Sequence, residues 1–206
     1  MNQRQIDNFF QVLSYNIKKL GRKKAKVILT GAAAGNLLGG NRPSIDIDFA
    51  LICDKRHIED IEKAIKQTSL AAGIAVNYSQ DIDRWSEITF LDYKKHTIHY
   101  KTLGCVEISI LSPDYWSIGK ITRYIDTDVN DLVKVLKNNP LSCLELSKLW
   151  GKALAKSPLS STSSSFKKHV EHFLKTYGKL IWGKNYNQGL CLRAFWNAAG
   201  IKSEQA

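Results

Sequence analysis

The stretch that decides the fold runs from Val27 to Phe49 and reads VILTGAAAGNLLGGNRPSIDIDF. Its first three residues form a short apolar run, typical of a buried strand, and Gly31 marks the end of that strand. The small apolar residues 32–38 predict a short helix that closes at two glycines. After a turn, apolar and polar residues begin to alternate, which predicts a second strand over 45–52.

Two aspartates, Asp46 and Asp48, lie one residue apart on this second strand. Because successive side chains of a strand point to opposite faces, both carboxylates share one face, and Ile45, Ile47 and Phe49 share the other. Two carboxylates that point the same way repel each other unless a divalent cation such as Mg²⁺ lies between them. Taken alone, the pair also fits a solvated strand edge.

The residues between the two strands suit a bulky anion. Gly31 and the alanines after it leave the backbone open where the first strand ends. The N–H groups at the start of the next helix, near Ala33, would point at that anion. A phosphate site and a metal site joined by one strand–helix–strand unit indicate phosphoryl or nucleotidyl transfer. The alternative is that Gly31 only forms a turn.

Outside this stretch, patterns typical of helices and of strands alternate along the chain, and the part from residue 113 onward has only helical patterns. The patterns predict helices over 5–20 and 55–72, strands over 74–78, 88–91, 97–100 and 106–111, and helices over 113–124, near 132–136, and over 141–155 and 166–199. Ser112 is expected to cap the helix that Pro113 begins, and Asp128 or Asn130 to open the next one. The serine-rich segment 157–165 is expected to be a linker or mobile loop. This order predicts an α+β fold, with a small mixed sheet flanked by helices and a helical C-terminal part.

The 206-residue chain has a formal net charge of +11, which its two ends supply. Residues 1–26 contain seven basic residues and one acidic residue, and residues 151–206 contain nine basic and two acidic ones. The stretch between them, which contains the aspartate pair, has fourteen basic and sixteen acidic residues. The basic tail fits either a helix that packs its aromatic face on the core and exposes its lysines, or a surface for RNA such as tRNA.

Composition also bears on the compartment. The N-terminus lacks the apolar run of a signal peptide, and no segment has the roughly 18 apolar residues of a membrane span. The four scattered cysteines form no C-x-x-C pair, so neither a zinc site nor a disulfide framework is expected. We expect a cytoplasmic protein with reduced thiols and no membrane partner.

The stretch 27–49 resembles the motif of the nucleotidyltransferase superfamily with the DNA polymerase β-type fold, in which a glycine ends a strand and a helix leads to Asp-x-Asp. It is most similar to bacterial and archaeal nucleotidyltransferase-like proteins of the AbiEii type, many of which occur in toxin–antitoxin pairs. The residues at positions similar to that motif are Gly31, Ala34, Leu37, Gly39 or Gly40, Arg42, Ser44, Asp46 and Asp48.

A second block resembles the same family, whose members have a Ser-Pro or Thr-Pro helix start, a lysine in that helix and a later D-x-x-D segment. Here the corresponding residues are Ser112-Pro113, Lys120, Asp128 and Asp131. The two blocks cover residues 27–136. The resemblance therefore implies a nucleotidyltransferase-like domain over 1–139 and leaves a helical C-terminal region over 140–206.

The resemblance implies a two-metal mechanism. A nucleoside triphosphate would lie with its β- and γ-phosphates over Gly31 and Ala32. Its α-phosphate would lie at two Mg²⁺ ions bound by the catalytic pair Asp46 and Asp48. Glu107 is the candidate third metal ligand and would help to deprotonate the acceptor hydroxyl. Its alternative is a plain surface position.

Further residues receive roles from the same resemblance. Asp92 is a weaker rival for the third ligand. Lys120 would contact the triphosphate, or would be a solvated helix lysine. Arg42 and Ser44 would contact the nucleotide, although Arg42 also fits an ordinary turn residue.

The D-x-x-D segment that follows would supply polar partners for Lys120. Arg123, Asp128 and Asp131 are expected as partners around that lysine, and N-capping of the next helix is the alternative for Asp128. Two departures from the family pattern stand out: Ala32 replaces a Gly or Ser that often contacts phosphate, and Thr127 replaces a basic residue.

These features lead us to expect a Mg²⁺-dependent nucleotidyltransferase. It would transfer a nucleoside monophosphate from a triphosphate to a hydroxyl of RNA or protein, within a toxin–antitoxin system. The alternative is a weak or inactive relative that binds nucleotide or serves as an antitoxin-like or protein-interaction module. The expected partners are a nucleoside triphosphate, tRNA or other RNA, and a cognate antitoxin or toxin protein.

Overall fold

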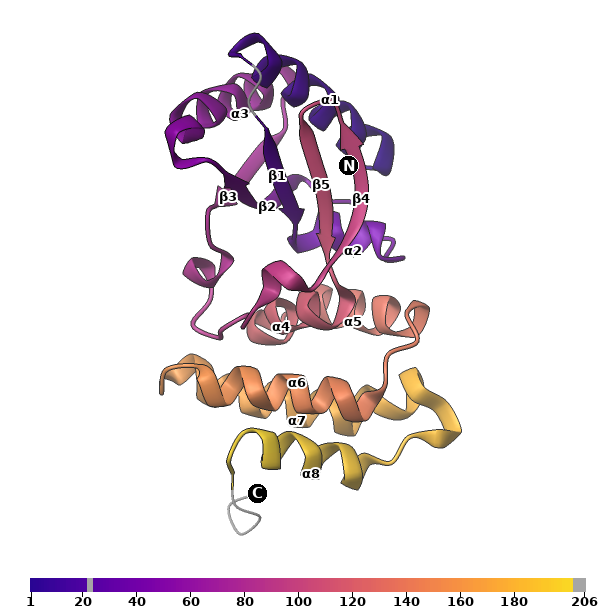
Figure 1. Cartoon of the computed structure of the whole chain (residues 1–206). Coiled ribbons are helices and arrows are strands. Elements are labelled where there is room, and N and C mark those ends of the chain that lie inside the picture. Colours follow the sequence, from indigo (N-terminus) through magenta and orange to yellow (C-terminus); the bar gives the residue numbers. More distant parts are fainter. Residues whose placement is uncertain (22–23, 202–206) are drawn as a thin grey trace. The chain divides into compact units, whose positions relative to one another are not determined.

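The computed structural model describes residues 1–21 and 24–201, apart from the side chains of residues 84 and 85. Its described elements form a mixed five-stranded sheet and eight α-helices, which confirms the expected α+β class (Figure 1). They belong to two compact units. Unit 1 comprises residues 1–37, 41–82 and 94–112, and unit 2 comprises residues 38–40, 83–93 and those from 113 onward.

The sheet of unit 1 has the strand order β3-β2-β1-β5-β4. Strand β1 is antiparallel to β2 and parallel to β5, β2 is parallel to β3, and β4 and β5 form an antiparallel pair. A register shift between His99 and Lys101 interrupts the β4–β5 ladder. The strands are β1 (Ala25–Leu29), β2 (Asp46–Cys53), β3 (Ala75–Ser79), β4 (Thr97–Leu103) and β5 (Val106–Leu111).

Three helices accompany this sheet: α1 (Gln3–Lys19), α2 (Gly31–Leu37) and α3 (Ile58–Ala72). The apolar stripe of α1 is buried, and its Phe10 ring meets the Phe49 ring of β2 at a centroid distance of 5.9 Å. Helix α3 packs beside α1, where the Asn16 amide donates to the Thr68 hydroxyl (2.9 Å). Since Phe49 alternates with the two aspartates along β2, α1 covers the face opposite to them.

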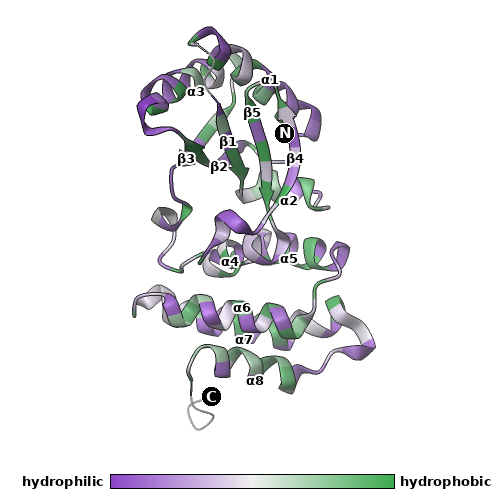
Figure 2. Ribbon diagram, viewed as in Figure 1, coloured by the Kyte–Doolittle hydropathy of each residue, from purple (hydrophilic) through white to green (hydrophobic). Residues whose placement is uncertain are grey.

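Unit 2 contains the remaining helices: α4 (Pro113–Arg123), α5 (Asp126–Asn138), α6 (Cys143–Lys156), α7 (Ser161–Trp182) and α8 (Gln188–Ala198). Their apolar residues alternate with polar ones at helical spacing (Figure 2). The fully buried Trp150 of α6 lies at the core, where its indole N–H donates to the Ser117 hydroxyl of α4 (2.8 Å). A side chain at Gly151 would overlap the Phe195 carbonyl, so this glycine permits α6 and α8 to pack closely.

Two sequence-based element predictions are wrong. Residues 88–91 are irregular and form no strand, because the Thr89 N–H donates to the Ser157 hydroxyl and the Phe90 N–H to the Asp83 carboxylate. The segment 157–165 is not a linker throughout, since Ser160 and Ser163 form a capping box that starts α7 at residue 161.

Smaller corrections concern helix ends. Helix α5 begins at Asp126, before both predicted starts, and the predicted helix over 166–199 is divided between α7 and α8. The buried Ser112 hydroxyl has no hydrogen-bond partner among the described residues, so it does not cap α4.

The predicted domain boundary at residue 139 lies inside unit 2, which also contains α4 and α5. Within the described part of the chain, no helix is long and apolar enough to cross a membrane.

Candidate active site

Asp46 and Asp48 lie at the start of β2 and face the same side of the sheet. Both side chains are partly exposed, whereas Ile47 and Phe49 between and after them are fully buried. Ile45, which was predicted to share the face of Ile47 and Phe49, precedes the strand and is 88% exposed. The strand thus buries one face and presents two neighbouring carboxylates on the other.

Asn77 connects the two carboxylates. It lies on β3 directly beside Asp48 in the parallel ladder. Its side-chain N–H group donates to Asp46 Oδ2 (3.2 Å) and to Asp48 Oδ1 (3.0 Å). The sequence analysis missed Asn77. Asn77 lies between Val76 and Tyr78 on a strand that a helical crossover joins to β2. Such a connection favours parallel pairing of the two strands, and this signal could have placed Asn77 beside the aspartates.

Gly31 lies against the second carboxylate. Its φ of +60° is in the left-handed region, and a Cβ built on it would overlap the Asp48 carboxylate. The backbone at this point is tied to β2, because the Thr30 N–H donates to the Asp48 carbonyl (2.9 Å). Ala32 follows within the first turn of α2. A glycine is therefore required at position 31 for two reasons: the positive φ of the turn and the close approach of the Asp48 carboxylate.

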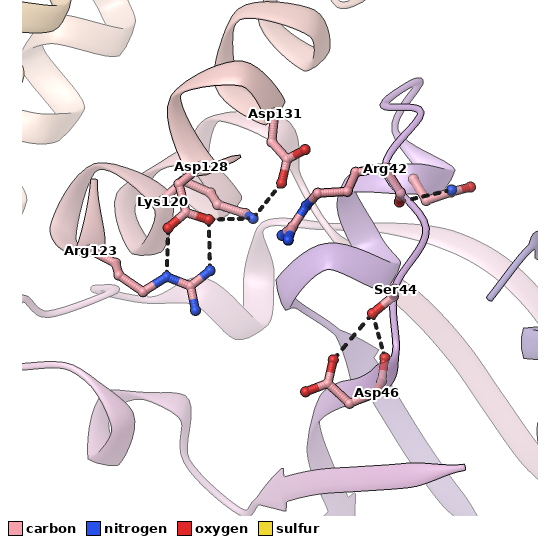
Figure 3. A network of polar contacts seen from close by, with 8 residues as sticks. Arg42, Ser44, Asp46, Lys120, Arg123, Asp128 and Asp131 are labelled. Atoms are coloured by element: carbon pink, nitrogen blue, oxygen red, sulfur yellow. Dashed lines mark hydrogen bonds and ion pairs between the residues drawn. The ribbon is translucent and has the colours of Figure 1, made fainter. Parts of the chain in front are cut away.

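Ser44 supports the first carboxylate (Figure 3). Its buried hydroxyl donates to the Asp46 carbonyl (2.6 Å) and lies 3.2 Å from Asp46 Oδ1. The preceding loop is tied to α2, since the Asn36 side chain donates to the Arg42 carbonyl (3.3 Å). Ser44 thus orients Asp46 from within the loop.

The structure does not bring Glu107 to the pair. In the strand register, Lys26 lies opposite both Ile52 and Glu107. Glu107 is therefore level with a position four residues beyond Asp48, roughly 13 Å along the strand. Its carboxylate instead pairs with Lys26 Nζ (3.0 Å) and is about half exposed. Glu107 shares the face of the carboxylate pair, but its position along the strand does not suit the third metal ligand.

Among the described residues of the sheet, the register supplies no third carboxylate on β5 at the level of the pair. The β5 residue opposite Ala50, across Ile28, is the buried Ser109. Asp92 belongs to unit 2. Among the residues that the structure describes, no group of three or more Asp, Glu, His or Cys side chains is arranged to bind a metal ion.

Unit 2 brings together the other predicted site residues (Figure 3). Lys120 Nζ is 2.8 Å from Asp128 Oδ1 and 2.7 Å from Asp131 Oδ2. Arg123 donates to both oxygens of Asp128, at 2.5 and 2.7 Å. Lys120 is only 4% exposed and Asp128 is completely buried. The two basic residues and two acidic residues therefore form one ion-pair network.

This network sets the ionisation of Asp128. Burial alone would raise the pKa of this carboxyl, but hydrogen bonds from Arg123 and Lys120 outweigh burial and keep the pKa below its usual value. Asp128 lies in the first turn of α5, which begins at Asp126, so it does not serve as the N-cap residue. Two of the three N–H donors of Lys120 are engaged by carboxylates.

Comparisons with protein-family models, with curated proteins and with solved structures found no match to this chain.

Proposed function

We propose that the chain is a Mg²⁺-dependent nucleotidyltransferase whose catalytic pair is Asp46 and Asp48. The observation that carries this proposal is the shared orientation of the two carboxylates at the start of β2, bridged by Asn77 and packed on Gly31. Carboxylate oxygens are hard ligands of the kind that Mg²⁺ prefers. The two carboxylates therefore fit this ion, whereas Asn77 faces them with its side-chain N–H groups and orients them.

The proposed reaction transfers a nucleoside monophosphate to a hydroxyl of RNA or protein. The acceptor oxygen forms a bond to the α-phosphorus, the bond from that phosphorus to the bridging oxygen breaks, and pyrophosphate leaves. When bound, Mg²⁺ supplies charge neutralisation for the phosphate oxygens. The acceptor proton passes to solvent or to a carboxylate of the pair.

The chain's own residues have distinct parts in this proposal. Ser44 and Asn77 orient the two carboxylates before substrate arrives, which lowers the cost of ordering them. Gly31 and Ala32 leave the backbone between β1 and α2 open to the terminal phosphates.

The biological setting is part of the proposal. The resemblance to AbiEii-type proteins supports a toxin–antitoxin pair, with a cognate protein as partner and tRNA or other RNA as the acceptor. It also supports a cytoplasmic location.

A second function is favoured by one observation. The neutral amide of Asn77 contacts both carboxylates, and Glu107 lies elsewhere on the sheet. A site with two carboxylates can bind a Mg²⁺–nucleotide complex and yet stabilise the attacking oxygen poorly. The second candidate is therefore a nucleotide-binding protein with little or no transferase activity.

One experiment separates the candidates. The protein is incubated with Mg²⁺, each α-labelled nucleoside triphosphate, and total tRNA or cell lysate. Asp46→Asn and Asp48→Asn remove the catalytic charges, and Glu107→Gln is the matched control because it removes a carboxylate elsewhere on the same sheet. We expect label transfer with the wild type and Glu107→Gln, and loss of transfer in both Asp variants.

The other outcomes are equally informative. Saturable nucleotide binding without transfer would support the second candidate. Absence of both binding and transfer would overturn both. Transfer that persists in Asp46→Asn and Asp48→Asn would show that the reaction belongs to another site.

A further inference from the structure

Unit 2 has a groove between α6 and α8, far in sequence from the carboxylate pair. Its volume is about 560 Å³. The floor consists of Leu144 from α6 and of Leu190, Ala194 and Ala198 from α8. The close packing of α6 and α8 at Gly151 fixes the two walls. Leu190 is 44% exposed, so the floor presents apolar surface to solvent.

Most of the lining residues recur at a spacing of four. On α6 these are Leu144, Lys148 and Lys152, and on α8 they are Leu190, Ala194 and Ala198, with Arg193 and Asn197 beside them. Residues four apart lie on one face of a helix. Each row spans eight residues, so the groove is roughly 12 Å long.

Basic residues line the groove beside its apolar floor. Lys148, Lys152 and Arg193 all belong to the lining, and no lining residue is acidic. Lys148 has one carboxylate partner, Glu145 (2.7 Å), in an exposed ion pair that contributes little to stability. An occupant of this groove would therefore need apolar groups along its centre and negative charge at its edges.

We infer that this groove is the docking site for an acidic amphipathic helix of a protein partner. A helix presents apolar side chains at the same four-residue spacing as the apolar row of α8, and acidic side chains beside them would face Lys148 and Lys152 of α6. A second copy of this chain does not fit, because each copy has a net charge of +11. Nucleic acid would meet the lysines but would leave the leucine and alanine floor uncovered.

The test uses a labelled synthetic peptide of about 14 residues, long enough to exceed the groove at both ends. Leucines occupy one face of the peptide and glutamates flank them. A companion peptide has lysines in place of the glutamates. Binding is measured by fluorescence anisotropy with the full chain, and circular dichroism confirms that each variant is folded.

Two protein variants carry the same change of charge. Lys152→Glu/Arg193→Glu reverses two charges in the groove, and Lys175→Glu/Lys179→Glu reverses two exposed charges on α7 in the same unit. We expect saturable binding of the acidic peptide, with a Kd raised at least ~10-fold by the groove variant and changed less than ~2-fold by the α7 variant. Leu190→Ser is expected to raise the Kd about 5-fold through the loss of apolar contact.

Several outcomes would overturn the inference. These are the absence of saturable binding, equal weakening by the groove and α7 variants, or equal affinity for the lysine peptide. Displacement of the peptide by single-stranded RNA, with the same loss in the groove variant, would assign the groove to nucleic acid instead. The test does not depend on transferase activity.

Discussion

Both units of this chain bring two aspartates together, and they do so in opposite ways. In unit 2, Asp128 and Asp131 are buried and are neutralised by Lys120, with Arg123 as a further partner of Asp128. In unit 1, Asp46 and Asp48 are partly exposed and accept hydrogen bonds from the neutral Asn77 amide.

The difference indicates what each pair is for. Buried carboxylates with cations of their own have their charge satisfied within the fold, and removal of one partner leaves a costly unpaired charge. Carboxylates that reach solvent and accept hydrogen bonds from a neutral amide can take up a cation from outside. The first arrangement is structural, whereas the second suits a binding site.

The largest expected effect comes from breaking the buried network. Lys120→Met leaves Asp128 and Asp131 buried without their shared lysine, and should lower the free energy of unfolding by about 3–5 kcal/mol. Urea denaturation measures this loss. Lys148→Met is the control, because it breaks an exposed ion pair and should cost less than about 1 kcal/mol. Similar losses in both variants would contradict the structural role of the Lys120 network.

The pH dependence of stability sharpens the same contrast. Because the pKa of Asp128 is lowered in the folded state, its contribution is complete above the unfolded-state pKa of about 3.9 and is lost as pH falls through the folded-state pKa. Asp128→Asn should therefore flatten the decline in stability below about pH 4. Asp126→Asn, at an exposed neighbour in the same turn, is the control and should leave the decline as it is in the wild type.

Asn77→Asp tests the carboxylate pair of unit 1. A third carboxylate in place of the amide removes two hydrogen bonds and adds repulsion, so the metal-free protein should lose about 1–2 kcal/mol. Mg²⁺ should restore this loss by binding the variant more tightly than the wild type. Thermal unfolding with Mg²⁺ and with EDTA measures both effects. A variant that Mg²⁺ does not stabilise would argue against a metal site here.

The smallest effect is expected at Glu107. Glu107→Gln breaks an exposed ion pair with Lys26 and should lower stability by at most about 1 kcal/mol. Label transfer and the Mg²⁺-dependent thermal shift should be unchanged. A large loss of either would return Glu107 to the site despite its register.

The sequence predicted local features well because helices and strands have their own periods. The strand–helix–strand unit around Gly31, the face shared by Asp46 and Asp48, and the fold class all follow from patterns a few residues long. The serine-rich segment before α7 was misread because composition suggests mobility, whereas Ser160 and Ser163 are placed to cap a helix.

These local patterns did not predict how strands that are distant in the sequence pair with one another. Glu107 has the residue type of a metal ligand, but only the register, which places it opposite Lys26, shows that it lies far along the strand from Asp48. The contact of Asn77 with both aspartates depends on the parallel pairing of β2 with β3. Such registers result from the packing of the whole sheet, so single-sequence patterns do not encode them.

The strand order has a consequence for the order of folding. The pairing that builds the carboxylate site joins Asp48 to Asn77 across 29 residues, whereas β1 and β5 pair Leu29 with Ile110 across 81. Loop closure therefore favours the former by about 0.9 kcal/mol. We expect pulse-labelled hydrogen exchange to find the β2–β3 amides protected before those of β5. The reverse order would show that the apolar β1–β5 contacts outweigh this entropy. If the β2–β3 pairing does form first, Asp46, Asp48 and Asn77 come together before the sheet is complete.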